Sequence, residues 1–336
     1  MSRTSESSAT SSPSCRSSSR PSRRGRAKLT SVLTGFTKSR WFKLVWIVPA
    51  ILLGLFLVVL AARMIRELPA VASFMTEYPG ESELPESAPV GFPAWLGWQH
   101  FLNAFFILLI IRTGWQIRTT KRTAAYWTRN NTGLLRTKNP PVRIALHVWF
   151  HLSLDTLWVL NGVIFYVLIF ATGQWMRIVP LSWDVFPNAV SVAIQYASLN
   201  WPTENGWVNY NALQLLAYFI TVFIAAPLAL ITGIRMAPGL AGRFARLDRV
   251  FPLPLARAVH FPVMLWFVGF IIVHVTLVLA TGALRNLNHM YAARDDLSWW
   301  GFGIFAISLV VMAVAWIAAR PSILSSLAGL TGSVRR

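Results

Sequence analysis

Two histidines, His260 and His274, stand 14 residues apart within one apolar stretch that runs from Arg257 to Gly282. At about 100° per residue, 14 residues make four helical turns less about 40°, so both imidazoles leave the same face of a helix. At about 1.5 Å per residue, they are about 21 Å apart in a hydrocarbon layer about 30 Å thick. The helix is therefore predicted to place one imidazole near each membrane surface, where a polar ring indicates a functional site.

Partner histidines occur on two other apolar stretches at matching depths. His100 lies near the start of one stretch, at the depth expected for His274. His147 and His151 lie near the start of the next, at the depth of His260. Two imidazoles on opposing helices supply the two axial nitrogens of a b-type haem and leave no open position on its iron. The pattern therefore predicts two such haems, and electron transfer rather than oxygen activation.

His147 and His151 compete for one axial position, because four residues place them on roughly one helical face, about 6 Å apart in depth. Arg143 precedes His147 by four residues, and Arg257 precedes His260 by three. If both arginines mark the same interface, His147 matches His260 in depth. His147 is therefore the preferred ligand, and His151 is the alternative, lining the haem pocket or a quinone site. Arg143 and Arg257 are candidates to neutralise haem propionates.

Two further polar residues bear on this prediction. Asp155 is a carboxylate deep in an apolar stretch, and it is either a proton-handling group near a quinone or a polar contact to a neighbouring helix. His289 falls in a short polar loop and is expected to lie at the surface. A zinc site is not expected, because the histidines are spread over about 20 Å of depth without a compact ligand cluster.

The composition indicates a membrane protein with several spans. Of the 336 residues, 55% are hydrophobic and 13% are charged. The net charge of +19 lies in the N-terminal tail and in alternate loops, which follows the positive-inside rule and argues against nucleic-acid binding. The single cysteine, Cys15, excludes a disulfide framework and any cysteine-ligated iron–sulfur cluster.

Six spans are predicted in a bacterial inner membrane, with both termini in the cytoplasm. They cover residues 41–62, 94–117, 144–172, 209–233, 257–282 and 299–319. The loop 118–143 has seven Lys and Arg and no acid, so it is placed in the cytoplasm, whereas the acidic loop 63–93 is placed outside. Pro227 is expected to kink the fourth span. Residues 185–199 are expected to form a short surface helix.

The expected fold is an all-α integral membrane protein whose second to fifth spans form a four-helix di-haem bundle. Residues 1–38 are Ser- and Arg-rich and are expected to be a disordered basic tail. Residues 39–93 add an extra anchor and an acidic outer loop. The di-haem domain covers 94–320, and a cytoplasmic tail covers 321–336.

Four spans end on a shared pattern, in which a Thr-Gly pair is followed within a few residues by Arg. The pattern begins at Thr113, Thr172, Thr232 and Thr281. The favoured interpretation is a helix C-terminus with a small residue and an arginine that reaches to the interface. The alternative is that glycine permits close helix packing or the approach of a flat cofactor.

Over residues 95–320 the chain resembles the bacterial di-haem cytochrome b561 superfamily, which includes the b-type cytochrome subunit of nickel-dependent hydrogenases and the gamma subunit of formate dehydrogenase. The resemblance rests on His100, on LHVWF with His147, on NYNALQLLAYF and its closing ITG, and above all on the spacing of His260 and His274. It implies two haems b, with His100 paired with His274 and the second family helix paired with His260. The extra first span turns this core over relative to the usual orientation of the family.

The resemblance also implies a quinone as one redox partner and a non-membrane catalytic subunit as the other. The expected function is electron transfer between the quinone and an extracytoplasmic oxidoreductase, such as a molybdopterin enzyme, in a setting of membrane lipid. Two rivals stay open. One is a haem-free, proton-coupled transporter, and the other is a stand-alone transmembrane haem reductase of an external acceptor.

Overall fold

The computed structural model describes residues 40–132, 136–201, 205–239 and 245–336. Within these ranges, six helical segments are long and apolar enough to cross a membrane. They are α2 (Arg40–Arg66), α4 (Ala94–Thr119), α5 (Leu146–Ala171), the continuous run α7, η3 and α8 (Ala212–Met236), α10 (Leu253–Ala280) and α12 (Trp300–Ala318). Each begins and ends within about one helical turn of its prediction. The predicted all-α integral membrane fold with six spans is confirmed.

The chain divides into two compact units, residues 1–61 and residues 62–336, and α2 contains the boundary between them. The described side chains of α2 are almost all exposed from Leu44 onward, including Trp46, Leu52 and Phe56. A helix that is apolar all round is stable only in an apolar surrounding. The span is therefore expected to be solvated by lipid over most of its surface.

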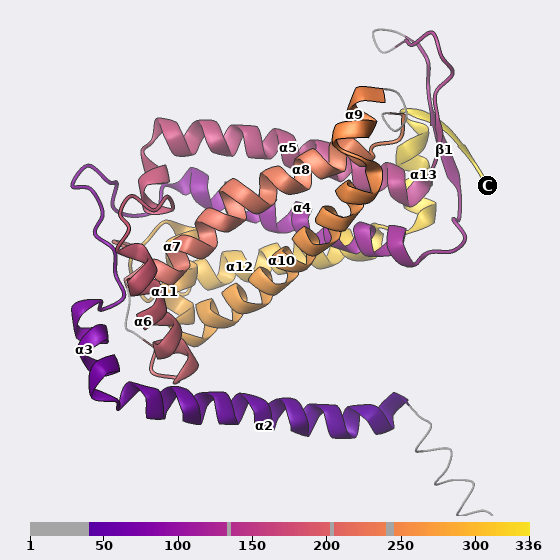
Figure 1. The fold of residues 1–336 in the computed structure, drawn as a ribbon. Coiled ribbons are helices and arrows are strands. Elements are labelled where there is room, and N and C mark those ends of the chain that lie inside the picture. The colour runs from indigo at the N-terminus through magenta and orange to yellow at the C-terminus, as the bar shows by residue number, and fades with distance from the viewer. Residues whose placement is uncertain (1–39, 133–135, 202–204, 240–244) are drawn as a thin grey trace, which may run out of the picture. The chain divides into compact units, whose positions relative to one another are not determined.

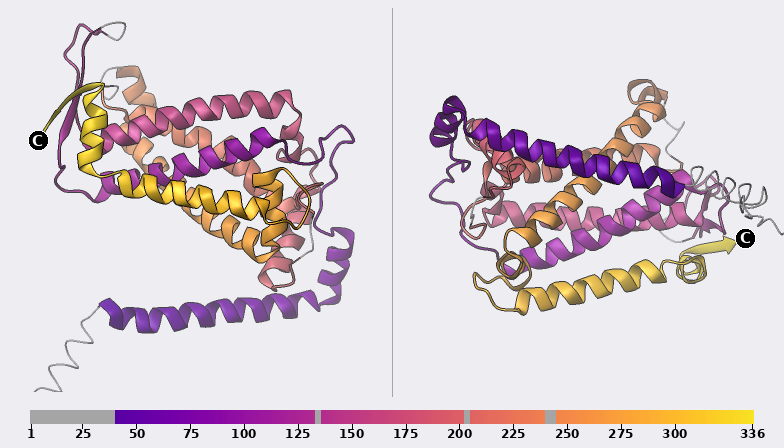
Figure 2. Two further views of the ribbon diagram at one scale, coloured as in Figure 1. Left: turned by 180° about the vertical axis from the view of Figure 1, so that it is seen from behind. Right: turned by 90° about the horizontal axis from the view of Figure 1, so that it is seen from below.

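The second unit is a helical bundle (Figures 1 and 2). In it α4 packs against α5, α8 packs against α10, and α12 lies beside α4. Many large apolar side chains on these helices are exposed, such as Leu160 and Ile272, whereas polar ones such as Thr113, Asn161 and Thr232 are buried. This inverted distribution suits a bundle in lipid, where polar groups must find partners inside the protein.

The fourth span contains a π-helical turn, η3 (Ile220–Ala225), between α7 (Ala212–Phe219) and α8 (Ala226–Met236). Pro227 follows directly and has no backbone N–H to donate, so carbonyls one turn earlier lose a partner. The hydroxyl of Tyr166 on α5 donates to the carbonyl of Val222 at 2.6 Å and satisfies one of them. The distortion expected at Pro227 thus takes the form of a π turn.

One end of the bundle carries a small sheet that the sequence did not predict. We call it the basic end. Strand β1 (Tyr126–Arg129) pairs antiparallel with both β2 (Arg143–Ala145) and the C-terminal β3 (Gly332–Arg335). Helix α13 (Pro321–Gly329) packs beneath the sheet, and Trp127 donates from Nε1 to the Ala328 carbonyl at 3.0 Å. The predicted C-terminal tail is therefore ordered, and it lies at the same end as the loop between the second and third spans.

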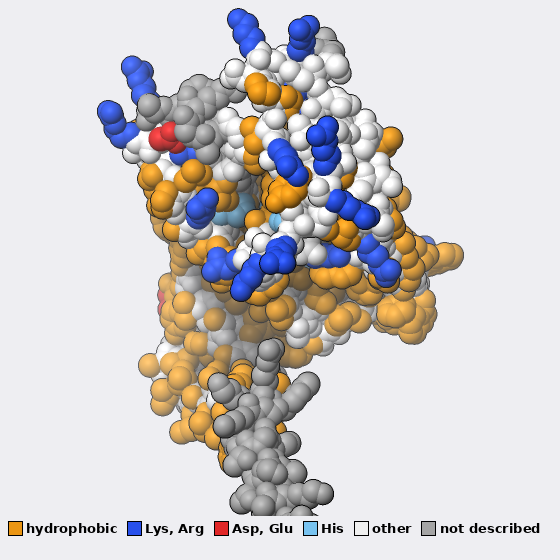
Figure 3. All heavy atoms as spheres, turned by 90° about the vertical axis from the view of Figure 1, so that its right-hand side faces the viewer, with side chains coloured by type: hydrophobic (Ala, Val, Ile, Leu, Met, Phe, Trp, Pro, Cys, Tyr) orange, Lys and Arg blue, Asp and Glu red, His pale blue; other side chains and the backbone are white. Residues whose placement is uncertain are grey.

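Figure 3 looks onto the basic end and shows Lys and Arg side chains spread across it, with little acidic surface. Exposed basic residues occur in the loop between the second and third spans, in the loop between the fourth and fifth spans, and in the C-terminal segment. They include Arg118, Lys121, Arg122, Arg136, Lys138, Arg246, Arg249, Arg320, Arg335 and Arg336. Short helix α9 (Ala245–Val250) lies here, and its Asp248 pairs with the buried Arg235. The charge distribution matches the positive-inside pattern on which the predicted topology rests.

The opposite end, which we call the loop end, is built from short helices. They are α3 (Pro69–Glu77), η2 (Gln174–Arg177), α6 (Val185–Ala197), α11 (Ala283–Leu287) and η4 (Asn288–Ala292). Helix α6 confirms the predicted surface helix, and its buried Val185 and Ala189 pack on Ala212 and Leu215 of α7. Asn211 caps α7 by accepting a hydrogen bond from the backbone N–H of Gln214 at 2.8 Å.

Candidate functional site

Two histidines at the basic end, His151 on α5 and His260 on α10, each contact a threonine on a neighbouring helix. Nδ1 of His151 lies 2.7 Å from the hydroxyl of Thr113 on α4. Nδ1 of His260 lies 2.8 Å from the hydroxyl of Thr232 on α8. The two imidazoles also lie within electrostatic range of each other. We call His151 and His260 the basic-end pair.

The threonine contacts bear on the tautomer of both rings. A hydroxyl has one proton to donate. The hydroxyl of Thr113 lies 2.9 Å from the carbonyl of Leu109 in its own helix, and that of Thr232 lies 2.5 Å from the carbonyl of Leu228. With the hydroxyl proton directed at these carbonyls, each hydroxyl accepts from the Nδ1–H of its histidine and the lone pair lies on Nε2, the state of an imidazole that is ready to bind a metal. With the hydroxyl proton directed at Nδ1, the same distances hold and the tautomer is reversed.

Both contacts are made by the Thr-Gly pattern, which occurs four times in the sequence. The glycines after the two threonines lie beside the imidazoles: a Cβ built on Gly114 is 3.5 Å from Cε1 of His151, and one on Gly233 is 3.7 Å from Cε1 of His260. In the other two copies, the hydroxyls of Thr172 and Thr281 bond to carbonyls of their own helices at 2.7 and 2.8 Å. Thr172 and Thr281 are helix C-caps, as the favoured interpretation predicts. Thr113 and Thr232 instead lie inside α4 and α8, where each contacts a histidine.

The loop end holds a second pair, His100 on α4 and His274 on α10, which we call the loop-end pair. Their ring centroids are 6.2 Å apart, with 53° between the planes. His274 stacks on Phe270 at 5.4 Å and 6°. The ring of His100 meets Tyr291 edge-on at 5.7 Å, and its buried Nδ1 has no hydrogen-bond partner in the described part of the chain.

The loop-end pair fits a shared metal. Metal–imidazole bonds are about 2 Å long, and a ring nitrogen lies about 1.2 Å from the ring centre, so a metal bound between two imidazoles would hold their centroids roughly 6.4 Å apart. The observed 6.2 Å agrees with this value. A buried ring nitrogen without a partner costs free energy, which a bound metal would recover. No group of three or more His, Cys, Asp or Glu gathers in the described ranges, so a bare metal would lack further side-chain ligands.

The sequence favoured His147 over His151 as the partner of His260, and the structure gives these two histidines different surroundings. His147 is half-buried one turn before His151, and its imidazole makes no hydrogen bond within the described residues. The depth comparison relied on Arg143 and Arg257 marking one interface. Arg143 instead lies in β2 with its guanidinium 4.2 Å from the ring of Tyr126, whereas Arg257 is exposed on α10. Of the two candidates, only the alternative, His151, makes a hydrogen bond to a neighbouring helix within the described residues, and the choice of ligand stays a prediction.

Asp155 lies one turn after His151 on the same helix. Its Oδ2 is 3.6 Å from Nε2 of His151, which is longer than a hydrogen bond. The side chain of Asp155 is about a third exposed and that of His151 is mostly buried, at 30% and 13%. A carboxylate is thus available beside the basic-end pair, on the Nε2 side of His151, where it favours a proton on that nitrogen.

The expectation that His289 lies at the surface is wrong. This residue of η4 is 3% exposed, between Phe92 at 5.8 Å and Trp207 at 5.3 Å, measured between ring centroids. Burial lowers the pKa of His289, and the hydrogen bond of 2.8 Å between its Nε2 and Asp295 acts in the opposite direction. The error arose because a polar loop sequence gives no sign that the loop folds back over the bundle.

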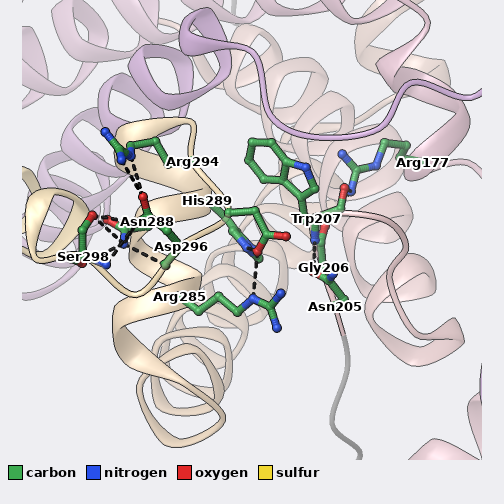
Figure 4. A network of polar contacts seen from close by, with 11 residues as sticks. Arg177, Asn205, Gly206, Trp207, Arg285, Asn288, His289, Arg294, Asp296 and Ser298 are labelled. Atoms are coloured by element: carbon green, nitrogen blue, oxygen red, sulfur yellow. Dashed lines mark hydrogen bonds and ion pairs between the residues drawn. The ribbon is translucent and has the colours of Figure 1, made fainter.

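A buried arginine lies next to this histidine. Figure 4 shows Trp207 between His289 and Arg177, with the guanidinium directed at backbone carbonyls. Arg177 is 1% exposed, and burial lowers its pKa. Its guanidinium lies 5.0 Å from the ring of Tyr210, and burial raises the pKa of Tyr210 to about 12, with Arg177 acting in the opposite direction.

Comparison of the chain with protein-family models, with curated proteins and with solved structures finds no match. The fold and the site define a multi-pass helical membrane protein with two histidine pairs inside its bundle. The chemistry of these pairs is inferred from their own residues.

Sequence reasoning missed three of the residues that shape the site. Thr113 and Thr232 carried a signal, because the Thr-Gly pattern was visible, but their direction toward a histidine depends on helix rotation. Arg177 was grouped with arginines that reach to the interface, because it follows a Thr-Gly pair. Its burial depends on how the loop between the third and fourth spans folds, for which the sequence offers no periodic signal.

Proposed function

We propose that the protein is a membrane cytochrome b that carries electrons across the bilayer between a quinone and an extracytoplasmic oxidoreductase. The observation that carries this proposal is the occurrence of histidines from different helices at both ends of one bundle, with the rings of His100 and His274 6.2 Å apart. The threonine contacts of His151 and His260 support it, because they suit an imidazole whose Nε2 is free to bind a metal. A bis-histidine b-type haem needs one such pair, so two pairs suit two haems. When bound, haem supplies reversible one-electron transfer.

In this proposal the loop-end pair, His100 and His274, holds one haem, and the basic-end pair, His151 and His260, holds the other. His151 replaces His147 as the fourth ligand because it is oriented by Thr113 and lies within electrostatic range of His260. The threonines set ring orientation and keep Nε2 unprotonated. Arg257 stays a candidate to neutralise a haem propionate, whereas Arg143 is engaged by an aromatic ring.

The proposed setting is a bacterial inner membrane, with the basic end and both termini in the cytoplasm. The positive charge of the basic end supports this orientation, as does the pairing of β3 with β1, which places the C-terminus beside the basic loop. The partner oxidoreductase, such as a molybdopterin enzyme, would then meet the loop end. Quinone and lipid would reach the bundle through its exposed apolar surface.

The test is a dithionite-reduced minus oxidised spectrum of the purified protein, with haem quantified per chain. Two low-spin b haems per chain are expected. If well-folded protein made with an adequate haem supply contains no haem, the proposal is wrong.

A matched pair of variants tests the fourth ligand. His151→Ala should lose one haem and leave the loop-end haem spectrally intact, whereas His147→Ala, one turn away on the same helix, should keep both. The reverse result would restore His147 as the ligand. Retention of both haems in both variants would exclude α5 from haem ligation.

One observation favours the haem-free transporter as a second candidate. His151 and Asp155 form a close pair inside the membrane-spanning region, 3.6 Å apart, and such pairs occur in proton relays. A proton relay through His151 and Asp155 would not account for the loop-end pair or for the distance between its two rings. The haem quantification separates the two candidates directly.

A further inference from the structure

Arg177 in η2 is the largest side chain that is fully buried, and all its hydrogen bonds are to backbone carbonyls. Its Nη1 donates to Gly91 at 2.7 Å, and its Nη2 donates to Gly206 at 2.6 Å and to Trp207 at 3.2 Å. Its Nε is also buried and has no hydrogen-bond partner in the described part of the chain. The guanidinium is thus held rigidly but is not fully satisfied.

The charge of Arg177 has no carboxylate partner within the described residues. Asp295, whose partner His289 lies next to Arg177, is itself bound by Arg285 and His289, each at 2.8 Å. Arginine stays protonated in proteins even when it is buried. A buried charge without a counter-ion is costly, so its presence suggests that another group in the site profits from it.

A row of aromatic rings joins this charge to the loop-end pair. The guanidinium lies 5.0 Å from the ring centre of Tyr210. The ring of Tyr210 meets that of Tyr218 at 5.0 Å, and Tyr218 meets His274 at 5.9 Å. Three steps therefore separate Arg177 from a proposed haem ligand, one from guanidinium to ring and two from ring to ring. The rings of Tyr210, Tyr218 and His274 are partly buried, so water screens the charge less than it does at the exposed basic end.

We propose that Arg177 is a fixed positive charge that raises the midpoint potential of the loop-end haem, an inference that rests on the proposed function. An oxidised haem carries one more positive charge than a reduced one, so a nearby guanidinium favours the form that has gained the electron. No proton transfer is needed for this effect. The loop-end haem becomes the better electron acceptor, which directs electrons toward the end where the partner oxidoreductase would dock.

The size of the effect follows from Coulomb's law. The contacts of 5.0, 5.0 and 5.9 Å place the guanidinium within about 16 Å of the ring centre of His274. For a unit charge at about that distance, at an effective dielectric constant of about 20, the oxidised-to-reduced ratio changes roughly five- to tenfold. A tenfold change corresponds to about 59 mV for a one-electron couple. A shift of this size is measurable in a potentiometric titration of the haem absorbance.

The experiment compares Arg177→Gln with Arg177→Lys in the full-length protein. Both variants lose the forked hydrogen bonds to Gly91 and Gly206, so a purely structural role would affect them alike. Only Arg177→Gln removes the charge. Arg177→Gln should lower the midpoint potential of one haem, by the amount that corresponds to a roughly five- to tenfold change in its oxidised-to-reduced ratio. Arg177→Lys should keep the parent potential. The transition that shifts in the titration should be the one that is absent from the titration of His274→Ala.

Two outcomes would overturn the inference: an unchanged potential in Arg177→Gln with both haems present, or equal shifts in both variants. If Arg177→Gln does not fold, Asn205→Asp serves instead. Asn205 adjoins Gly206, so its carboxylate would offset the guanidinium and lower the same potential, and no downward shift there would overturn the inference. Absence of haem from the parent protein would refute the proposed function itself, whereas an unshifted potential in a two-haem protein refutes only the role of Arg177.

Discussion

Thr232→Val is the substitution that most directly tests how the basic-end pair is prepared. Valine keeps nearly the shape of threonine but lacks the hydroxyl that His260 contacts at 2.8 Å. Thr232 is 1% exposed, so no bulk water replaces the lost group. His260 would then be free to carry its proton on either nitrogen, and its ring would lose the contact that sets its rotation.

The expected cost follows from the hydrogen bond that is removed. A buried N–H left without an acceptor costs about 1–3 kcal/mol, and loss of an outer-shell partner of a metal-bound histidine typically weakens metal binding about 10- to 100-fold. These ranges agree, since about 1.4 kcal/mol is tenfold in an equilibrium constant. Thr232→Val should therefore release the basic-end haem at least about ten times more readily, with the loop-end haem unaffected.

The assay is haem retention per chain during a graded challenge with mild denaturant or apo-myoglobin, followed by the Soret absorbance. The control is Thr172→Val, which alters the same Thr-Gly pattern, but whose hydroxyl donates at 2.7 Å to the carbonyl of Leu168 in its own helix rather than contacting a histidine. The control should behave like the parent protein. Equal haem loss from the two variants, or none from either, would refute the claim that the hydroxyl orients His260.

Three further predictions concern the rest of the bundle. Gly301→Ala should cost about 1–3 kcal/mol and lower the thermal midpoint, because an added Cβ would overlap the backbone of Leu287; an unchanged midpoint would contradict this close approach. Hydrogen bonds from Arg285 and His289 lower the pKa of Asp295 to about 2, below its unfolded value of about 3.9. The ionised Asp295 therefore stabilises the folded protein above about pH 4, and this contribution is lost as the pH falls toward 2. Asp295→Asn should therefore melt earlier than the parent at pH 7, with the gap closing in acid; a gap that does not change with pH would contradict the linkage. Arg112→Gln should cost about 1–3 kcal/mol in denaturant titrations, because Arg112 donates to two carbonyls at the C-terminal end of α12; equal stability would show that water replaces those bonds.

The spans were predictable because lipid imposes a simple rule on them. Each must be an apolar helix of about 20 residues with its backbone bonded internally, whatever its neighbours are. The small sheet at the basic end follows no such rule. Its strands have three or four residues. They are joined by pairing between the segment after the second span and the C-terminal segment, for example Trp127 with Val334. Nothing local marks that pairing.

The site was predictable to the level of a helix but not to the level of a helix face. The 14-residue spacing places His260 and His274 on one face of α10 whatever surrounds them. The choice between His147 and His151 needs the rotation of α5 against α4, which tertiary packing sets. Depth matching by flanking arginines is a weak guide to that rotation, because Arg143 lies in a strand against Tyr126 whereas Arg257 lies on α10.

The π turn in the fourth span has a consequence for how this protein tolerates insertions and deletions. One residue more or fewer in a helix rotates everything beyond it by about 100°. Thr232 lies two turns past Ile220–Ala225, and its hydroxyl reaches His260 only in the present phase. A single-residue deletion within the π turn would leave an unbroken, equally apolar span that still inserts into a membrane. The threonine would nevertheless face a different neighbour, so a change that hydropathy cannot detect would disable one end of the bundle.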